Sequence, residues 1–360
     1  MEYKNKYLNI QDNLSLKICC ITYNLHGINL NTNQINEILT IHKNNSCDIY
    51  AIATQENQRS ILMNLLFWDK SQFELDLAHF FGKEYVRLTT ETLGGIHLII
   101  FIKNIHKNYI LNFYKGYVKT GFYGMIGNKG GIGIGFKIYN ISFIFINCHL
   151  SYGFNNSLLR NYDFDYIKKN LHSDLDKYDI IIWMGDFNYR VNKTTEEIED
   201  IYKNKKEMTL LEYDQMNNEI KNYNLKSYGF KEGTINFLPT YKYNDDYKNE
   251  IICDMPDHIP SWTDRIIYKI NGKKFVENEV NETNKKYNDE NAIIEEDKEY
   301  DDNSDNDYED ANEEYNSDIN NENEENINKY SFKLIQYNSM QNIVFSDHKP
   351  VFAYFTVNFK

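Results

Sequence analysis

The chain has 360 residues, 41% of them hydrophobic, which is typical of a folded protein with a substantial core. Its formal net charge is −14, but residues 271–330 hold 21 of the 53 acidic residues and only six of the 39 lysines and arginines, so the rest is close to neutral. A near-neutral folded part without a basic stripe argues against nucleic acid as a partner.

Neither a signal-peptide core nor an apolar run of about 18 residues occurs, and the five cysteines have no paired spacing. We therefore expect a cytoplasmic protein without disulfides or structural zinc, for which any membrane contact is peripheral, at the cytoplasmic face. Composition sets apart one acidic segment, 271–330, from the rest of the chain. That segment has too few apolar residues to offset the entropy of ordering, so we expect disorder; an acidic arm that binds a partner is the alternative.

Eight runs rich in β-branched or aromatic residues predict strands. They are 17–25, 47–56, 96–104, 130–139, 141–150, 179–188, 261–270 and 348–357. Three stretches between them predict helices: 32–44, 155–175 and 194–222. The second places Leu158, Leu159, Tyr162, Tyr166 and Ile167 near helical spacing, and the third opens with a capping-box pair, Thr194 and Glu197.

Alternating strands and helices would fit a parallel sheet, but 130–139 followed directly by 141–150 has the form of an antiparallel hairpin. Both kinds of pairing are therefore expected. We predict an α/β fold, a four-layer α/β sandwich with two mixed β-sheets flanked by helices.

Polar side chains stand at one end of six predicted strands. They are Asn24, Gln55 with Glu56, Asn147 with His149, Asp186 with Asn188, Asp264 with Arg265, and Asp347 with His348. If these ends converge, the oxygen ligands suit a hard cation such as Mg²⁺, and the set suits hydrolysis of a phosphate ester. Taken singly, each has an ordinary structural explanation, such as a solvated strand end for Glu56 or a structural imidazole for His149.

The segments that carry these residues resemble the inositol polyphosphate 5-phosphatases, within the superfamily of magnesium-dependent exonucleases, endonucleases and phosphatases. WMGDFNYRV (183–191) and IPSWTDRII (259–267) resemble the two signatures of the family. Further matches, in the family's order, are GNKGGIGIGF, NCHL, RNYDFDYI, LLEYDQM, EGTINFLPTYKY and SDHKPV. The resemblance runs from about Lys17 to the C-terminal end. It implies an N-terminal extension, 1–16, and a catalytic domain, 17–360, that is interrupted by the acidic segment 271–330.

The resemblance implies a role for each matched residue. The implied catalytic residues are His149, Asp186, Asn188, Asp264, Asp347 and His348. The implied substrate contacts are Lys129, Tyr189, Arg190, Tyr241, Lys242 and Arg265, and the implied Mg²⁺ ligands are Asn24 and Glu56. Asp186 would position or deprotonate the attacking water, and the two histidines would donate to the scissile phosphate. Asp264 would orient one histidine, and which one is left open.

The implied reaction is magnesium-dependent removal of the 5-phosphate from phosphoinositides such as PI(4,5)P2, from soluble inositol polyphosphates, or from both, by a monomer. One alternative is a superfamily relative that cuts nucleic acid or sphingomyelin. Another is a catalytically inactive module that binds phosphoinositides.

Two regions bear on the substrate. Many family members have a basic pair before the second signature that contacts a neighbouring 4-phosphate, whereas residues 250–262 here offer only His258, beside Asp254 and Asp257. A 4-phosphate contact is therefore not implied. The segment 119–130 contains Phe122, Tyr123, Met125 and Ile126, which would either enter a membrane surface or pack inside the protein.

Overall fold

The computed structural model describes residues 14–43, 45–57, 71–121, 126–222, 224–244, 251–271 and 330–359. All of these belong to one compact unit, 1–277 with 329–360, while a second unit, 278–328, lies outside the described residues. The predicted insertion likewise lies outside them, except for its end residues Asn271 and Tyr330. Tyr330 is buried at the start of a strand, and Leu16 is buried in the core, so the folded part extends past both predicted boundaries.

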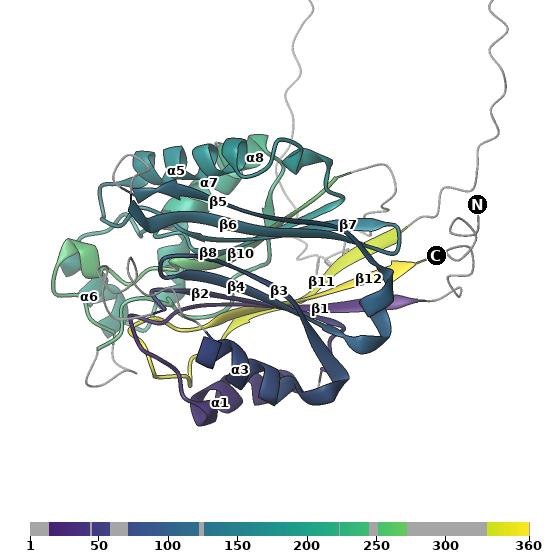
Figure 1. Cartoon of the computed structure of the whole chain (residues 1–360). Coiled ribbons are helices and arrows are strands. Elements are labelled where there is room, and N and C mark those ends of the chain that lie inside the picture. Colours follow the sequence, from purple (N-terminus) through teal and green to yellow (C-terminus); the bar gives the residue numbers. More distant parts are fainter. Residues whose placement is uncertain are drawn as a thin grey trace, which may run out of the picture. The chain divides into compact units, whose positions relative to one another are not determined.

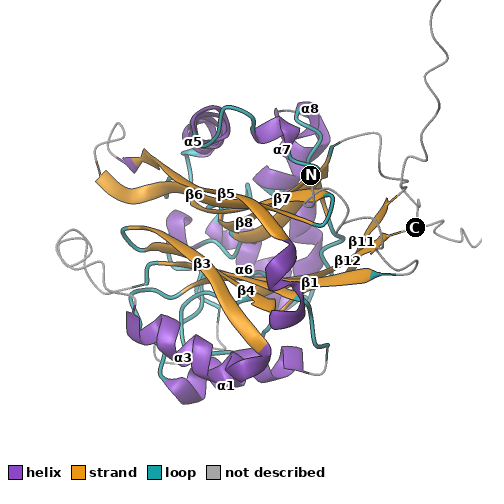
Figure 2. Cartoon of the chain, turned by 45° about the vertical axis from the view of Figure 1, so that its right-hand side comes forward, coloured by secondary structure: helices purple, strands orange, loops and turns teal. Residues whose placement is uncertain are grey.

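In the described ranges, two six-stranded sheets face each other and helices cover their outer faces (Figure 1; Figure 2). The first sheet has the order β11-β12-β1-β2-β4-β3, with β1 (Ser15–Asn24), β2 (Ile49–Gln55), β3 (Tyr85–Leu93), β4 (Ile96–Lys103), β11 (Tyr330–Ser339) and β12 (Val351–Phe359). The second has the order β5-β6-β7-β8-β10-β9, with β5 (Ile110–Thr120), β6 (Ile126–Ile138), β7 (Ile141–His149), β8 (Ile180–Asp186), β9 (Lys231–Glu232) and β10 (Asp264–Ile270). β1 and β2 pair in parallel, as do β7 and β8, and the other pairs are antiparallel. The predicted four-layer α/β sandwich with two mixed sheets is confirmed.

The helices form the two outer layers. α1 (Thr32–Lys43) and α3 (Ser71–Phe81) cover the first sheet, and α5 (Ser157–Asn170), α7 (Gln215–Asn222) and α8 (Asn224–Ser227) cover the second (Figure 1). The helix predicted over 194–222 is wrong as one element: it divides into α6 (Thr195–Lys203), a 3-10 turn (Glu207–Tyr213) and α7. Lys205, with φ 54°, lies in the left-handed region and cannot continue α6. None of the described helices is both long and apolar enough to cross a bilayer.

Interior strands are apolar on both faces because both faces are covered. In β1, Ile18 and Cys20 pack between the sheets, while Cys19 and Ile21 pack under α1 and α3. Such strands read as continuous apolar runs rather than alternating ones. The capping box of α6 forms as predicted, with Thr194 and Glu197 each bonding the other's backbone N–H.

Strand register sets the position of the polar strand ends. His149 at the end of β7 pairs with Asp186 at the end of β8, and Asp186 pairs with Asp264 at the start of β10. Asn24 pairs with Gln55 at the ends of β1 and β2 in the other sheet. Paired residues point to the same face of a sheet, so their side chains lie side by side.

Candidate active site

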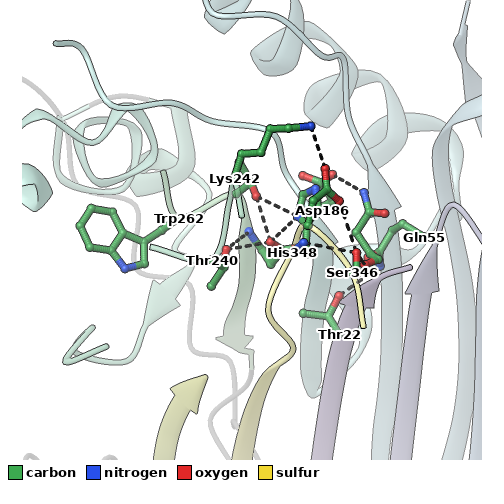
Figure 3. A network of polar contacts seen from close by, with 12 residues as sticks. Thr22, Gln55, Asp186, Thr240, Lys242, Trp262, Ser346 and His348 are labelled. Atoms are coloured by element: carbon green, nitrogen blue, oxygen red, sulfur yellow. Dashed lines mark hydrogen bonds and ion pairs between the residues drawn. The ribbon is translucent and has the colours of Figure 1, made fainter. Parts of the chain in front are cut away.

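Two buried amides join the sheets beneath the site. Gln55 donates to the Asn147 side-chain oxygen at 2.7 Å and to the Thr22 hydroxyl at 3.1 Å (Figure 3). Asn147 in turn donates to the carbonyls of Thr54 at 3.0 Å and His97 at 2.8 Å. These bonds fix the polar end of one sheet against that of the other.

Asp186 is the buried centre of the site. Its Oδ2 accepts a hydrogen bond from the Asn24 amide at 2.9 Å and lies 3.3 Å from His149 Nε2, while Oδ1 accepts the Asn188 backbone N–H at 2.9 Å. Burial would raise the pKa of Asp186, but its hydrogen bond to His149 and the nearby charge of His348 outweigh burial and hold that pKa well below its usual range. The side chain is therefore a carboxylate at neutral pH.

Glu56 is the residue directly after β2, and it lines the pocket. Its Oε1 lies 3.5 Å from the Asn24 amide nitrogen and 3.7 Å from His149 Nε2, which also contacts the Lys129 ammonium. Burial opposes ionisation, but the positive charges of His149 and Lys129 hold the pKa of Glu56 below its usual value. Glu56 thus presents a second carboxylate beside Asp186.

His348 pairs with Asp264, which settles the pairing that the sequence left open. The Nδ1–Oδ2 distance is 2.8 Å, and the hydroxyls of Thr240 and Thr263 donate to the same oxygen at 2.7 and 2.9 Å (Figure 3). Burial would lower the pKa of His348, but the charges of Asp264, Asp347 and Asp186 raise it to about 9. His348 is therefore an imidazolium at neutral pH.

Asp347 is a buried residue of the pocket lining that lies between Lys242 and His26. Its Oδ2 accepts a hydrogen bond from Lys242 Nζ at 3.1 Å, and its Oδ1 lies 3.4 Å from His26 Nδ1. Burial would raise the pKa of Asp347, but the charges of His348, His26 and Lys242 hold it below its usual value. A third carboxylate therefore stays ionised here.

These groups surround one pocket of about 230 Å³. Its lining includes the predicted residues Glu56, His149, Asp186, Asn188, Tyr241, Lys242, Asp347 and His348. Asn24, Lys129 and Asp264 contact this lining directly. Sequence reasoning missed His26 and Tyr152, which complete the lining. A signal for His26 was its place two residues after Asn24, in the turn that leaves the same strand.

Arg190 was predicted to contact the substrate, but it does not line the pocket. It lies behind the pocket and supports its lining. It is fully buried, donates to the Asn188 side-chain oxygen at 2.7 Å and to the Asp257 carbonyl at 3.1 Å, and stacks between the rings of Tyr152 and Tyr241. Its contacts orient the Asn188 carboxamide.

Two predicted substrate contacts, Tyr189 and Arg265, face away from the pocket. Tyr189 is buried under α5 and donates to Asn161 at 2.5 Å. Arg265 is enclosed and pairs with Asp214 at 2.8 Å and with both Glu232 oxygens at 2.6 Å. Arg265 directly follows Asp264 in β10, and successive strand residues point to opposite faces. Tyr189 follows Asn188, which lies past the end of β8 with φ 57°. The prediction is therefore corrected: both are buried structural residues.

Arg265→Leu is expected to lower the free energy of unfolding by about 3–5 kcal/mol, because Asp214 and Glu232 would keep their buried charges without a counter-ion. Lys269→Ala is the matched control: it lies on the same strand and pairs at 2.9 Å with the exposed Asp176, so its loss is expected to stay below about 1 kcal/mol. Urea unfolding measures both. Equal small losses would mean that the buried cluster adds no more stability than the surface pair.

The donor set fits a divalent cation. The carboxylates of Glu56, Asp186 and Asp347 offer oxygen atoms of the kind that Mg²⁺ and Ca²⁺ bind. The Asn24 carboxamide lies beside the first two, with its Nδ2 facing them and its Oδ1 accepting the His26 backbone N–H. In addition, the buried Asp264 Oδ1 has no hydrogen-bond partner among the described residues, and Asp264, Asp186 and His348 each place one ligand atom within 4.8 Å of the others.

A second hollow of about 530 Å³ adjoins the pocket and shares Tyr152 with it, and its lining residue Lys129 contacts His149 of the pocket. Its rim includes Leu159, Tyr162 and Tyr166 of α5. The spacing of the apolar residues on this helix therefore marks an exposed face: Leu158, Leu159, Tyr162 and Tyr166 are exposed, whereas the buried face is formed by Arg160, Asp163, Phe164 and Ile167.

A family model described as Endonuclease/Exonuclease/phosphatase family 2 matches residues 21–299. The chain belongs to this family. Endonuclease/Exonuclease/phosphatase family 2 relatives include synaptojanin from Caenorhabditis elegans, 35% identical over 53% of this chain and 17% of that protein. Type I inositol polyphosphate 5-phosphatase 1 from Arabidopsis thaliana is 34% identical over 53% of this chain and 35% of that protein. The matched part is thus a small share of each relative, and the resemblance to inositol polyphosphate 5-phosphatases is confirmed.

A solved structure of the family's fold is that of the inositol polyphosphate 5-phosphatase domain of SPsynaptojanin in complex with inositol (1,4)-bisphosphate and calcium. It aligns with a TM-score of 0.68 at 24% identity, covering 96% of this chain and 85% of that one. At this identity the likeness establishes the shared fold.

The structure describes one of the two regions that bear on the substrate, the segment before the second signature, and only part of the other, the apolar segment 119–130. His258 is paired with Asp254 at 2.5 Å, and Asp257 accepts the Phe154 backbone N–H at 2.6 Å. The apolar loop residues Phe122, Tyr123 and Met125, and the side chain of Ile126, lie outside the described residues.

Proposed function

We propose that this chain, with residues 17–360 as its catalytic domain, removes the 5-phosphate of a phosphoinositide or an inositol polyphosphate with Mg²⁺ as cofactor. The observation that carries the proposal is the convergence of the Asp186 carboxylate and the Asp264–His348 pair on one pocket. The names of the relatives, synaptojanin and inositol polyphosphate 5-phosphatase, support the substrate class.

Asp186 orients the attacking water in this proposal. Its carboxylate is fixed on both oxygens by Asn24 and by the Asn188 backbone. A base whose pKa lies far below 7 removes a proton poorly but accepts a hydrogen bond well, so its task is to aim the water at phosphorus. Arg190 and the Leu150 carbonyl hold the carboxamide of Asn188, which lines the same pocket.

Cationic groups stabilise the phosphate as charge builds on its oxygens. His348 donates from its free ring nitrogen while Asp264 holds Nδ1. Lys129, in contact with His149, and Lys242, bonded to Asp347, add positive charge around the pocket. Preorganised donors of this kind are a large part of catalysis in phosphoryl transfer.

Asn24 and Glu56 would hold the Mg²⁺, with Asp186 and Asp347 close by. When bound, the cation polarises a phosphate oxygen and lowers the pKa of a bound water. Removal of the cation with EDTA is therefore expected to stop the reaction.

A lipid substrate would rest against the exposed face of α5. Leu158 is 82% exposed and Tyr162 60% exposed, next to the hollow that adjoins the pocket. Exposed apolar side chains beside a site are suited to peripheral contact with a membrane surface. We accordingly propose that a lipid substrate is reached by such contact. We also propose that the protein is a cytoplasmic monomer.

Phosphate release from the purified protein tests the function. We expect release in Mg²⁺ that EDTA abolishes, from vesicles containing PI(4,5)P2, from soluble Ins(1,4,5)P3, or from both, and the ratio of the two rates measures the contribution of the membrane. A folded protein that releases phosphate from neither, and instead cleaves DNA, RNA or sphingomyelin, would overturn the proposal. Binding to the vesicles without any release would favour the inactive module.

A further inference from the structure

Three arginine side chains of the described residues are fully buried, and they differ in what surrounds their charge. Arg265 pairs with two carboxylates, those of Asp214 and Glu232. Arg160 and Arg190 form no ion pair with a carboxylate in the part of the chain that the structure describes. Burying a charge without a counter-ion is costly, so these two arginines call for a reason.

Neutral groups hold the guanidinium of Arg160. Its Nη1 donates to the carbonyls of Ser151 at 3.3 Å and Gly153 at 2.6 Å. Its Nη2 donates to the side-chain oxygen of Gln215 at 2.5 Å, and its Cζ lies 5.3 Å from the centre of the Tyr189 ring. The buried Nε has no hydrogen-bond partner among the described residues. These contacts orient the guanidinium but leave its positive charge uncancelled.

Arg190 is held in the same way, directly behind the pocket wall. It donates to the Asn188 side-chain oxygen at 2.7 Å and to the Asp257 carbonyl at 3.1 Å. Its Cζ lies 5.0 Å from the ring centre of Tyr152 and 4.4 Å from that of Tyr241. Asn188 and both tyrosines line the pocket, so only one layer of neutral side chains separates this charge from it.

The two arginines are neighbours. The Gln215 side-chain oxygen accepts both the Arg160 Nη2 bond and the Arg190 backbone N–H, the latter at 3.0 Å. Burial and the charge of Arg190 lower the pKa of Arg160 to about 10, and the more distant carboxylates of Asp186 and Asp163 offset this only in part. Arg160 is still a cation at neutral pH, so two like charges lie together behind the pocket.

A phosphate group in the pocket would supply the missing negative charge. A phosphate monoester carries roughly −1.5 to −2 at pH 7, and charges inside a protein are screened less than charges in water. We propose that Arg160 and Arg190 strengthen the binding of a phosphate group in this pocket through their charge, from behind its wall and without touching the ligand. The inference rests on the proposed function for the kind of ligand, but it concerns binding, which is measured without turnover.

Arg160→Gln is the test variant, because Arg190 also orients Asn188 whereas Arg160 contacts no residue of the pocket lining directly. Glutamine removes the charge and keeps side-chain N–H donors. In calorimetric titration of the full chain, we expect inorganic phosphate, in saturating Mg²⁺, to bind about tenfold more weakly than to the wild type, and Mg²⁺ alone to bind more tightly. Loss of a positive charge shifts the two affinities in opposite directions, whereas a loosened pocket would weaken both.

Arg160→Lys and Lys169→Met are the matched controls. Lysine keeps the charge at position 160 but cannot form the same fork of hydrogen bonds, so Arg160→Lys should bind both ligands nearly as the wild type does. Lys169 is exposed on the same helix, where water and salt screen its charge, so Lys169→Met should change neither affinity. If Arg160→Gln does not fold, Arg160→Met replaces it. If neither neutral variant folds, Arg160→Lys decides alone.

Three results would overturn the proposal. They are a parallel loss of phosphate and Mg²⁺ affinity in the neutral variant, unchanged affinities in that variant, and a loss of phosphate affinity in Arg160→Lys. The first and the third would show that Arg160 acts by holding the Ser151–Gly153 backbone. A protein that shows the opposite shifts yet releases no phosphate from an inositol phosphate or a phosphoinositide would overturn the proposed function and leave this inference standing.

Discussion

Asp186→Asn is expected to reduce phosphate release about a thousandfold or more while the protein stays folded. The substitution removes the negative charge that aims the water, and the amide would set one of its own N–H groups against a donor, either the Asn24 amide or the Asn188 backbone. The residue ends a strand, so the core between the sheets keeps its packing. Turnover in saturating Mg²⁺ and thermal unfolding measure the two effects.

Asp179→Asn provides the matched control for this experiment. Asp179 immediately precedes the same strand at its opposite end and accepts hydrogen bonds from the Ser142 N–H and hydroxyl. Its substitution is expected to leave turnover unchanged even if stability falls. An Asp186→Asn protein with turnover within tenfold of the wild type would remove Asp186 from the reaction.

The Asp264–His348 pair is expected to make both stability and activity fall as the pH rises toward 9. His348 has a pKa of about 9 when folded, against an ordinary value of 6.5. The folded state binds the proton on His348 more tightly than the unfolded state does. The stabilisation of the folded state is therefore complete below pH 6.5 and is lost as the pH rises through 9. The full difference is roughly 3 kcal/mol. The rate should fall over the same upper range, because neutral His348 no longer brings a positive charge to the phosphate.

Asp264→Asn tests this linkage. Without the carboxylate, the pKa of His348 should fall, so that the high-pH decline in kcat/KM begins at lower pH and turnover at pH 8 drops about a hundredfold. In urea unfolding between pH 6 and 9, in EDTA, the free energy of unfolding of this variant should not show the decline with pH that the wild type shows. Thr240→Val removes only one hydrogen bond to Asp264 and should leave the pH profile in place. Parallel profiles for wild type and Asp264→Asn would show that the pair does not set the pKa.

The sequence predicted every interior strand and missed every edge strand. The eight predicted runs correspond to β1, β2, β4, β6, β7, β8, β10 and β12, while β3, β5, β9 and β11 are the outer strands of the two sheets. Interior strands are buried on both faces and read as long apolar runs. An edge strand such as β5 carries exposed lysine and tyrosine, and its pairing depends on a neighbour that no local pattern specifies.

The residue types of the site were predicted from the sequence, but the directions in which some of the side chains point were not. Asp186 and Asp264 lie where strand ends were expected to converge, but alternation along β10 turns Arg265 to the opposite face, a rule that could have been applied from the sequence alone. Tyr189 could not be placed by this rule, because Asn188 before it lies past the end of β8 in left-handed backbone. The partner of His348 could not be predicted either, because it depends on how the two sheets are set against each other.

The site draws on both ends of the folded chain. The Ser346 hydroxyl donates to the Asn24 carbonyl at 2.8 Å across 322 residues of sequence, and β12 lies between β11 and β1 within its sheet. During synthesis, β1 therefore cannot pair with β12 until nearly the whole domain has left the ribosome. Catalytic competence would then appear abruptly, with the last strand, and a nascent chain arrested before β12 would carry Asp186 and Glu56 but no working pocket.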